Sequence, residues 1–157
     1  MFYYERKLKV KGYNLIIGVD EAGRGPLAGP VVAAAVALKT KRFTNRIDDS
    51  KKLTPLARDR AFLEITGKAI FGIGIVNEKI IDEVNIFAST RIAMENAVSA
   101  LLAKINAKKN IHILVDGNVK LNTAHPVTNI IRGDSRSKSI ASASILAKVT
   151  RDRIMDS

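Results

Sequence analysis

Four carboxylates in this chain follow runs of apolar residues, where an α/β protein often places reactive side chains. Asp20 and Glu21 follow the run Leu-Ile-Ile-Gly-Val, and Asp116 follows Ile-His-Ile-Leu-Val. Asp134 comes shortly after a third such run, Val-Thr-Asn-Ile-Ile. In an open α/β sheet, functional sites form at the carboxyl ends of the strands. We therefore expect the four carboxylates to meet at one edge of a sheet.

Clustered carboxylates repel one another and raise one another's pKa, and a divalent cation removes that conflict. The chain has no cysteine and only two histidines, so its candidate ligands are oxygen atoms. Oxygen ligands favour Mg²⁺ or Mn²⁺ over zinc or copper. The sequence thus predicts a magnesium or manganese site.

Each acid also has a structural interpretation. Asp116 precedes Gly117 and Asn118 and could form a turn, whereas Asp134 could cap the helix that follows it. The adjacent acids Asp20 and Glu21 have no evident structural use. For the four residues together, we favour the metal site.

The charge of the chain points to a polyanionic partner. Lysine and arginine number 26 against 15 aspartate and glutamate residues, which gives a net charge of +11. Such an excess is typical of proteins that bind nucleic acid or an anionic membrane surface. The basic residues are spread along the chain and do not gather on one amphipathic helix, which favours nucleic acid. An acidic pocket in a basic protein indicates phosphodiester cleavage.

Composition also bounds the fold and location. A chain of 157 residues suits one domain. The absence of cysteine excludes disulfides and thiol chemistry. No apolar run is long enough to span a bilayer, and the N-terminus lacks the apolar core of a signal peptide. We expect a cytoplasmic protein that is a monomer and has no membrane partner.

Strand-like and helix-like segments alternate along the chain. Short apolar runs, several rich in β-branched residues, predict strands at 15–19, 31–38, 69–76, 111–115 and 127–131. Thr54 and Pro55 are typical of a helix start, and that helix should end near Gly67. Further helices are predicted at 86–105 and from just after Ser135 toward the C-terminus. This pattern indicates an α/β domain with a five-stranded sheet.

The segment 23–29 is rich in glycine but does not fit a dinucleotide-binding loop, because a strand and not a helix follows it. Glycines let a backbone approach a ligand closely. Arg24, between Gly23 and Gly25, carries a guanidinium suited to phosphate. Alternatively, Arg24 pairs with Glu21 and holds the turn.

The run Gly-Val-Asp-Glu-Ala-Gly-Arg-Gly-Pro-Leu-Ala-Gly-Pro at 18–30 resembles the opening motif of the ribonuclease HII family. Four more segments match that family in the same order. They lie at 49–53, 81–86, 114–118, and at 133–135 followed by 143–152. The resemblance extends from about residue 15 to residue 155. The related ribonuclease HIII has lysine where this chain has Arg24.

The resemblance implies a ribonuclease H-like α/β fold, in which a mixed sheet of three antiparallel and then two parallel strands is flanked by helices. It implies one catalytic domain over residues 1–157. It assigns catalysis and metal binding to Asp20, Glu21, Asp116 and Asp134. It assigns substrate binding to Gly23, Arg24 and Gly25, near the 2′-hydroxyls, and to Ser50, Lys51 and Lys52, near phosphates.

The implied activity is hydrolysis of the RNA strand in RNA–DNA hybrids and at ribonucleotides embedded in duplex DNA. Two Mg²⁺ or Mn²⁺ ions would take part and leave 3′-hydroxyl and 5′-phosphate ends. Members of the family continue to a His-Lys-Gly-Tyr segment, and we expect this chain to lack that C-terminal part. Two alternatives stay open: a weakened fragment that only binds nucleic acid, and a structure-specific DNA nuclease of the same fold.

Overall fold

A five-stranded mixed sheet forms the centre of the computed structural model, which describes residues 1–23, 28–105 and 109–157. The strands lie in the order β3-β2-β1-β4-β5. Their bounds are β1 Leu15–Ala22, β2 Val31–Leu38, β3 Ala69–Val76, β4 Ile111–Asp116 and β5 Val127–Ile130.

Strand directions divide the sheet into two parts. β1, β2 and β3 pair in antiparallel fashion, whereas β4 pairs parallel with β1 and β5 parallel with β4. This confirms the predicted mixed sheet of three antiparallel and two parallel strands. All five predicted strands are present, although β5 ends one residue earlier than expected.

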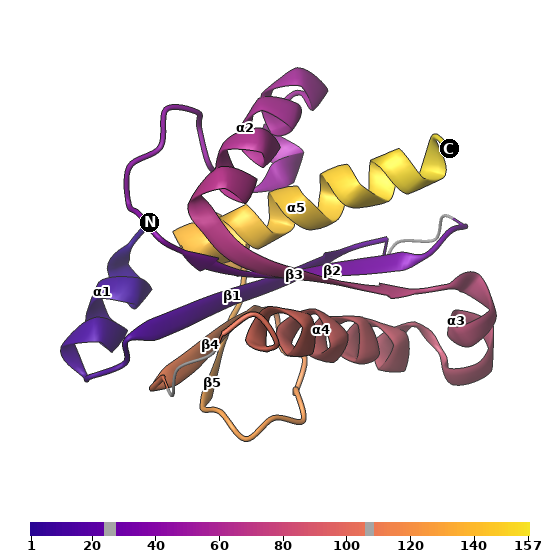
Figure 1. Cartoon of the computed structure of the whole chain (residues 1–157). Helices are drawn as coiled ribbons and strands as arrows, with labels where there is room; N and C mark the ends of the chain where they lie inside the picture. The colour runs from indigo at the N-terminus through magenta and orange to yellow at the C-terminus, as the bar shows by residue number, and fades with distance from the viewer. Residues whose placement is uncertain (24–27, 106–108) are drawn as a thin grey trace.

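Helices cover both faces of the sheet (Figure 1). α4 packs on one face, while α5 and α2 lie on the other. No helix among the described residues is long and apolar enough to cross a membrane. The helices are α1 Tyr3–Val10, α2 Pro55–Lys68, α3 Glu78–Val84, α4 Ile86–Leu102 and α5 Lys138–Met155, with 3₁₀ turns η1 Ser50–Lys52 and η2 Gly133–Ser135.

Small residues let the helices approach the sheet closely. β2 reads Val-Val-Ala-Ala-Ala-Val-Ala-Leu, and all but its last residue are buried because helices cover both of its faces. At Gly18 in β1, an added Cβ would lie 2.2 Å from the carbonyl carbon of Ser139 in α5. Gly18 therefore sets the distance between α5 and the strand that ends in Asp20.

The predicted helices are partly confirmed. Thr54 caps α2 as expected, because its Oγ1 accepts a hydrogen bond from Ala57 N at 3.1 Å. The predicted helix at 86–105 ends at Leu102, and α1 and α3 were not predicted as separate helices. Asp134 does not cap α5: that position belongs to Ser137, whose Oγ accepts from Ile140 N at 3.2 Å.

The contact at Gly18 generates a stability prediction. Gly18→Ala would force a methyl group into the backbone of α5, and we expect the free energy of unfolding to fall by about 3 kcal/mol. Gly67→Ala is the matched control, because a Cβ there meets nothing within 4 Å. Alanine in that exposed last turn of α2 should raise stability by about 0.5 to 1 kcal/mol.

Urea unfolding followed by circular dichroism measures both variants. If both substitutions changed the free energy of unfolding by the same small amount, this would contradict the close packing of α5 on β1.

Candidate active site

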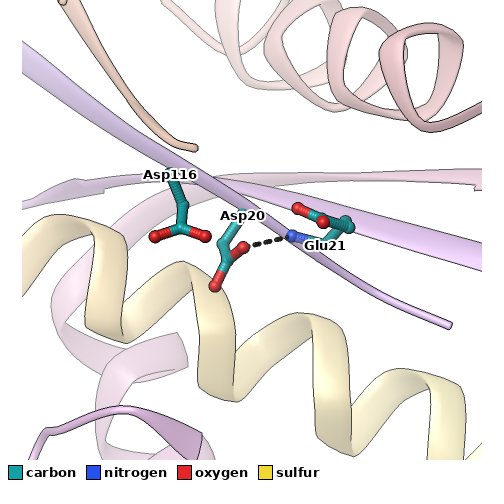
Figure 2. Close-up of side chains that lie close together, drawn as sticks. All are labelled: Asp20, Glu21 and Asp116. Carbon is teal, nitrogen blue, oxygen red and sulfur yellow. Dashed lines mark hydrogen bonds between the residues drawn. The ribbon is translucent and has the colours of Figure 1, made fainter. Parts of the chain in front are cut away.

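The parallel register of β1 and β4 places two carboxylates side by side. Val19 is opposite Val115 in the two strands, so the next residues, Asp20 and Asp116, are neighbours. Strand alternation turns both side chains to the face that α5 covers, because Gly18 already packs on that helix. Figure 2 shows the two carboxylates beside each other above α5.

Glu21 completes a group of three acids. One carboxylate oxygen from each of Asp20, Glu21 and Asp116 can be chosen so that all lie within 4.8 Å of one another. The backbone N–H of Glu21 donates a hydrogen bond to Asp20 Oδ1 at 2.8 Å, which fixes the Asp20 carboxylate (Figure 2). Only 4% of Asp20 is exposed.

Asp134 contacts this group from the segment between β5 and α5. It lies in η2, and its backbone N–H donates to Asp116 Oδ1 at 3.2 Å. Its carboxylate is not part of the group of three, but it lines the same cavity of about 220 Å³ as Asp20, Glu21 and Asp116. The structure thus brings the four predicted acids to one cavity.

Burial and the charges of neighbouring acids make Asp20 and Asp134 hard to ionise. Burial raises the pKa of Asp20 well above its ordinary value, and the charges of Glu21 and Asp116 raise it further. Burial, helped by the charges of Asp116 and Asp49, raises the pKa of Asp134 to about 6, although Lys51 acts in the opposite direction. At both carboxyl groups, neighbouring negative charges therefore add to the effect of burial.

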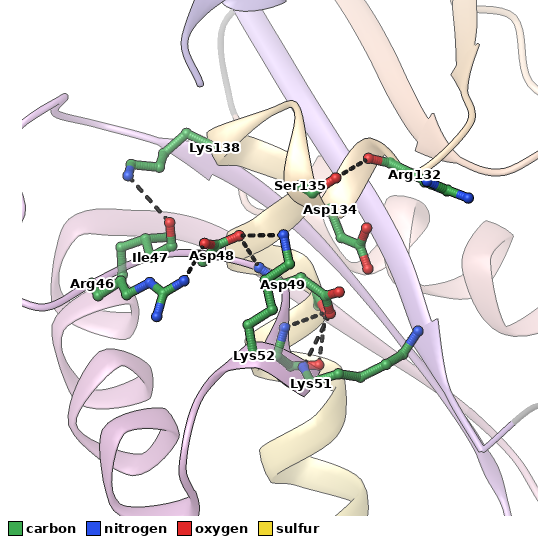
Figure 3. A network of polar contacts seen from close by, with 12 residues as sticks. Arg46, Ile47, Asp48, Asp49, Lys51, Lys52, Arg132, Asp134, Ser135 and Lys138 are labelled. Atoms are coloured by element: carbon green, nitrogen blue, oxygen red, sulfur yellow. Dashed lines mark hydrogen bonds and ion pairs between the residues drawn. The ribbon is translucent and has the colours of Figure 1, made fainter.

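Asp49 is an additional acid that the sequence analysis did not assign to the site. It precedes η1, accepts a hydrogen bond from Lys51 N at 3.0 Å and raises the pKa of Asp134. Figure 3 shows its carboxylate between Lys51 and Asp134. Its position at the start of the family-like segment 49–53 could have indicated that it belongs to the site.

The three residues of that segment predicted to bind substrate differ in position. Lys51 lines the cavity and is exposed. Ser50 also lines it but is buried, with its Oγ accepting a hydrogen bond from Ser144 Oγ at 2.9 Å. Lys52 is not among the lining residues and lies 3.9 Å from Asp48 (Figure 3). Only Lys51 is thus both exposed and at the cavity.

The glycine segment reaches the site at one described residue. Gly23 lines the cavity directly after β1. Arg24 and Gly25, also predicted to bind substrate, lie outside the described residues.

One face of α5 contributes side chains that were not predicted. Ser144, Lys148 and Arg151 all line the cavity. Their spacing of four and then three residues puts them on one helix face, and this periodicity could have revealed them. Lys148 also forms an ion pair with Asp152 at 3.0 Å.

His112 lies apart from the site. It is buried in β4, where its Nε2 is 2.7 Å from Thr128 Oγ1 and its ring packs edge-on against Tyr13. Burial lowers the pKa of His112, and these contacts give it a structural role.

The sheet order, with acids at the ends of β1 and β4, defines a protein of the ribonuclease H-like class. The crystal structure of ribonuclease H2 from Pyrococcus horikoshii OT3 superposes with a TM-score of 0.73 at 30% identity, covering 90% of this chain and 74% of that one. Bst-RNase HIII in complex with Mn²⁺ has the same fold, with a TM-score of 0.77 at 21% identity, over 92% of this chain and 54% of that one.

The family profile described as ribonuclease HII matches residues 17–157. The ribonuclease HII of Acetivibrio thermocellus is 52% identical over 157 residues, and that of Bacillus thuringiensis strain Al Hakam is 48% identical over 156 residues. This chain belongs to the ribonuclease HII family. The match covers 99% of this chain but only 59% and 58% of those relatives, so the chain spans about three fifths of their length.

The raised pKa of Asp134 predicts how the metal-free protein responds to pH. A carboxyl group whose pKa is raised by folding binds its proton more tightly in the folded state. Its contribution to stability is present at low pH and is lost as pH rises through about 6. Asp134→Asn does not titrate, so its stability relative to the unsubstituted protein should increase with pH.

Thermal unfolding in EDTA measures the gap in the free energy of unfolding between Asp134→Asn and the unsubstituted protein. Between about pH 4.5 and 8 this gap should widen by on the order of 1 to 3 kcal/mol. The comparison cancels the titration of His112, which both proteins share. Added Mg²⁺ should narrow the gap at the upper end. A gap that stays constant over this range would contradict the electrostatic description of the cavity.

Proposed function

We propose that this chain forms the catalytic part of an endoribonuclease that hydrolyses the RNA strand of RNA–DNA hybrids and cuts at ribonucleotides in duplex DNA. The observation that carries the proposal is the group of three carboxylates within 4.8 Å at the sheet edge of a chain in the ribonuclease HII family. The net charge of +11 supports a polyanionic substrate.

Asp20, Glu21, Asp116 and Asp134 would hold two Mg²⁺ or Mn²⁺ ions. The fit rests on two features. Every candidate ligand is a hard oxygen. The charges of Glu21 and Asp116, which add to the effect of burial on the pKa of Asp20, are ones that a cation would balance. The fold neighbour Bst-RNase HIII was solved with Mn²⁺. When bound, such a pair of ions supplies a water nucleophile and stabilises the leaving oxygen.

The remaining residues would bind and orient the substrate. Lys51 is exposed at the cavity and can contact a phosphate beside the acids. We propose that Gly23, Arg24 and Gly25 face the 2′-hydroxyls, because this hydroxyl is the group that distinguishes RNA from DNA. Ser50 would act indirectly, since its hydrogen bond to Ser144 fixes the segment that carries Lys51.

The two alternatives make different predictions in one gel assay. The substrates are an RNA–DNA hybrid, a duplex with one ribonucleotide and plain DNA, each with Mg²⁺, Mn²⁺ or EDTA. Cleavage of the first two with a metal ion supports the proposal. Cleavage of plain DNA would indicate a DNA nuclease, and binding without cleavage would indicate a fragment that only binds.

Substitution of Asp116 tests the metal-binding role. Asp116→Asn keeps the volume of the side chain but removes its charge, so we expect at least roughly a thousandfold loss of cleavage rate. Affinity for the hybrid, measured by fluorescence anisotropy, should change less than about threefold. Asp59→Asn on the exposed side of α2 is the matched control and should retain full activity. Substantial Mg²⁺-dependent cleavage by the Asp116 variant would exclude this role.

Binding should also depend steeply on salt. Contacts of lysine and arginine with phosphates release condensed counterions, so affinity for the hybrid should fall at least about tenfold between roughly 50 and 200 mM salt. Anisotropy titrations at several salt concentrations measure the slope. An affinity that hardly changes would mean that the basic surface does not contact the nucleic acid backbone.

A further inference from the structure

Arg151 is a buried cation beside the candidate active site. It lies in α5, only 6% of it is exposed, and it lines the cavity that contains the acids. No ion pair joins it to a carboxylate in the described part of the chain. A buried guanidinium is costly unless its N–H groups find partners, so its contacts should reveal its role.

Those contacts are backbone carbonyls of the segment that connects β1 and β2. Arg151 Nε donates a hydrogen bond to the carbonyl of Pro30 at 2.9 Å, and Nη2 donates to the carbonyl of Ala28 at 2.9 Å. One rigid, planar side chain thus holds two points of the same segment. We call Gly23 together with Ala28, Gly29 and Pro30 the loop neck.

The two glycines of the loop neck pack directly against Arg151. A Cβ on Gly23 would lie 2.3 Å from Arg151 Nε, and φ at Gly23 is +94°. A Cβ on Gly29 would lie 3.0 Å from Nη2 and 2.5 Å from Met155 Sδ, and φ there is +115°. Both positions therefore need glycine for space and for backbone conformation.

The loop neck is also close to the acids. Gly23 lines the same cavity as Asp20 and follows Glu21 by two residues. Any displacement of the neck would move backbone groups at the cavity edge. Arg151 can thus control the position of these backbone groups, although it is not one of the residues proposed to bind metal.

We propose that Arg151 is a positioning residue that fixes the loop neck and thereby sets the preference of the site for RNA over DNA. This rests on the proposed function, because a preference for RNA presupposes an RNA-containing substrate. Backbone groups distinguish a hydroxyl from a hydrogen only when they are held rigidly at hydrogen-bonding distance. Two hydrogen bonds from one guanidinium supply that rigidity, whereas the single ammonium of a lysine lacks the planar fork that spans both carbonyls.

The test uses the full chain with Arg151→Lys, which keeps the charge but loses the planar fork. A second variant, Gly23→Ala, places a methyl group against Arg151 Nε from the other side of the contact. Arg153→Lys is the matched control: it lies on the same helix, is exposed and packs over the Phe62 ring at 4.4 Å.

Three measurements are made on each variant. Steady-state cleavage of an RNA–DNA hybrid gives KM and kcat, and a DNA duplex of the same sequence, added as a competitor, gives its inhibition constant. Hydrogen exchange followed by NMR reports on the amides of Gly23, Ala28 and Gly29. Thermal unfolding reports on global stability.

For both test variants we expect KM for the hybrid to rise at least about fivefold, with kcat and the inhibition constant of DNA changed less than about twofold. Neck amides should exchange at least about tenfold faster while those of β4 do not change. The control should behave like the unsubstituted protein.

Unchanged neck exchange in Arg151→Lys would overturn the positioning role. Faster exchange with an unchanged ratio of hybrid to DNA affinity would overturn the role in selectivity, as would an equal loss of both affinities that follows a fall in melting temperature. If the unsubstituted protein cleaves no RNA-containing duplex, the proposed function fails, whereas the exchange measurement still tests the contact of Arg151 with the loop neck.

Discussion

The parallel pairing of β1 with β4 is the constraint on which the candidate site depends. Its register makes Asp20 and Asp116 neighbours on the face covered by α5. A shift by one residue would turn one of the two carboxylates to the opposite face, because side chains alternate along a strand. The apolar residues that precede these acids pack into cores on both faces of the sheet, so a slip would break the side-chain packing on both faces. Packing of the core thus holds two like charges together against their repulsion.

Helix α5 is the second element that the site requires. Its first turns pack on Gly18, and this close contact brings the later turns over the acids. Ser144, Lys148 and Arg151 then meet the cavity from one helix face. Ser144 also holds Ser50, so α5 positions the segment that carries Lys51. One helix therefore supports the acids, the basic segment and the loop neck together.

Much of this arrangement follows from the sequence. The apolar runs predict the five strands. The carboxyl ends of these strands predict where Asp20, Glu21 and Asp116 lie. Other features depend on contacts between distant segments. α1 is a mostly polar helix, and its Glu5 accepts hydrogen bonds from Ser139 N at 2.8 Å and Ser137 Oγ at 2.9 Å. No local pattern reveals such a contact.

α3 was not predicted, whereas the predicted helix start at Ile86 matches the start of α4. Asn85 adopts φ of +89° and caps α4 by accepting a hydrogen bond from Ala88 N at 2.9 Å. With ψ of 169° this backbone conformation is strained for any residue that has a side chain, so no local sequence pattern predicts it. The inward side chain of Ser50 and the approach of Asp49 to Asp134 likewise follow from tertiary packing.

The central claim is that the three neighbouring carboxylates form a divalent metal site. Crystals of the protein soaked in MnCl₂ and measured near the manganese absorption edge test it directly. The claim predicts an anomalous peak at about 2.1 Å from oxygens of Asp20, Glu21 and Asp116. A fully soaked crystal that shows manganese elsewhere, with these three carboxylates empty, would contradict it.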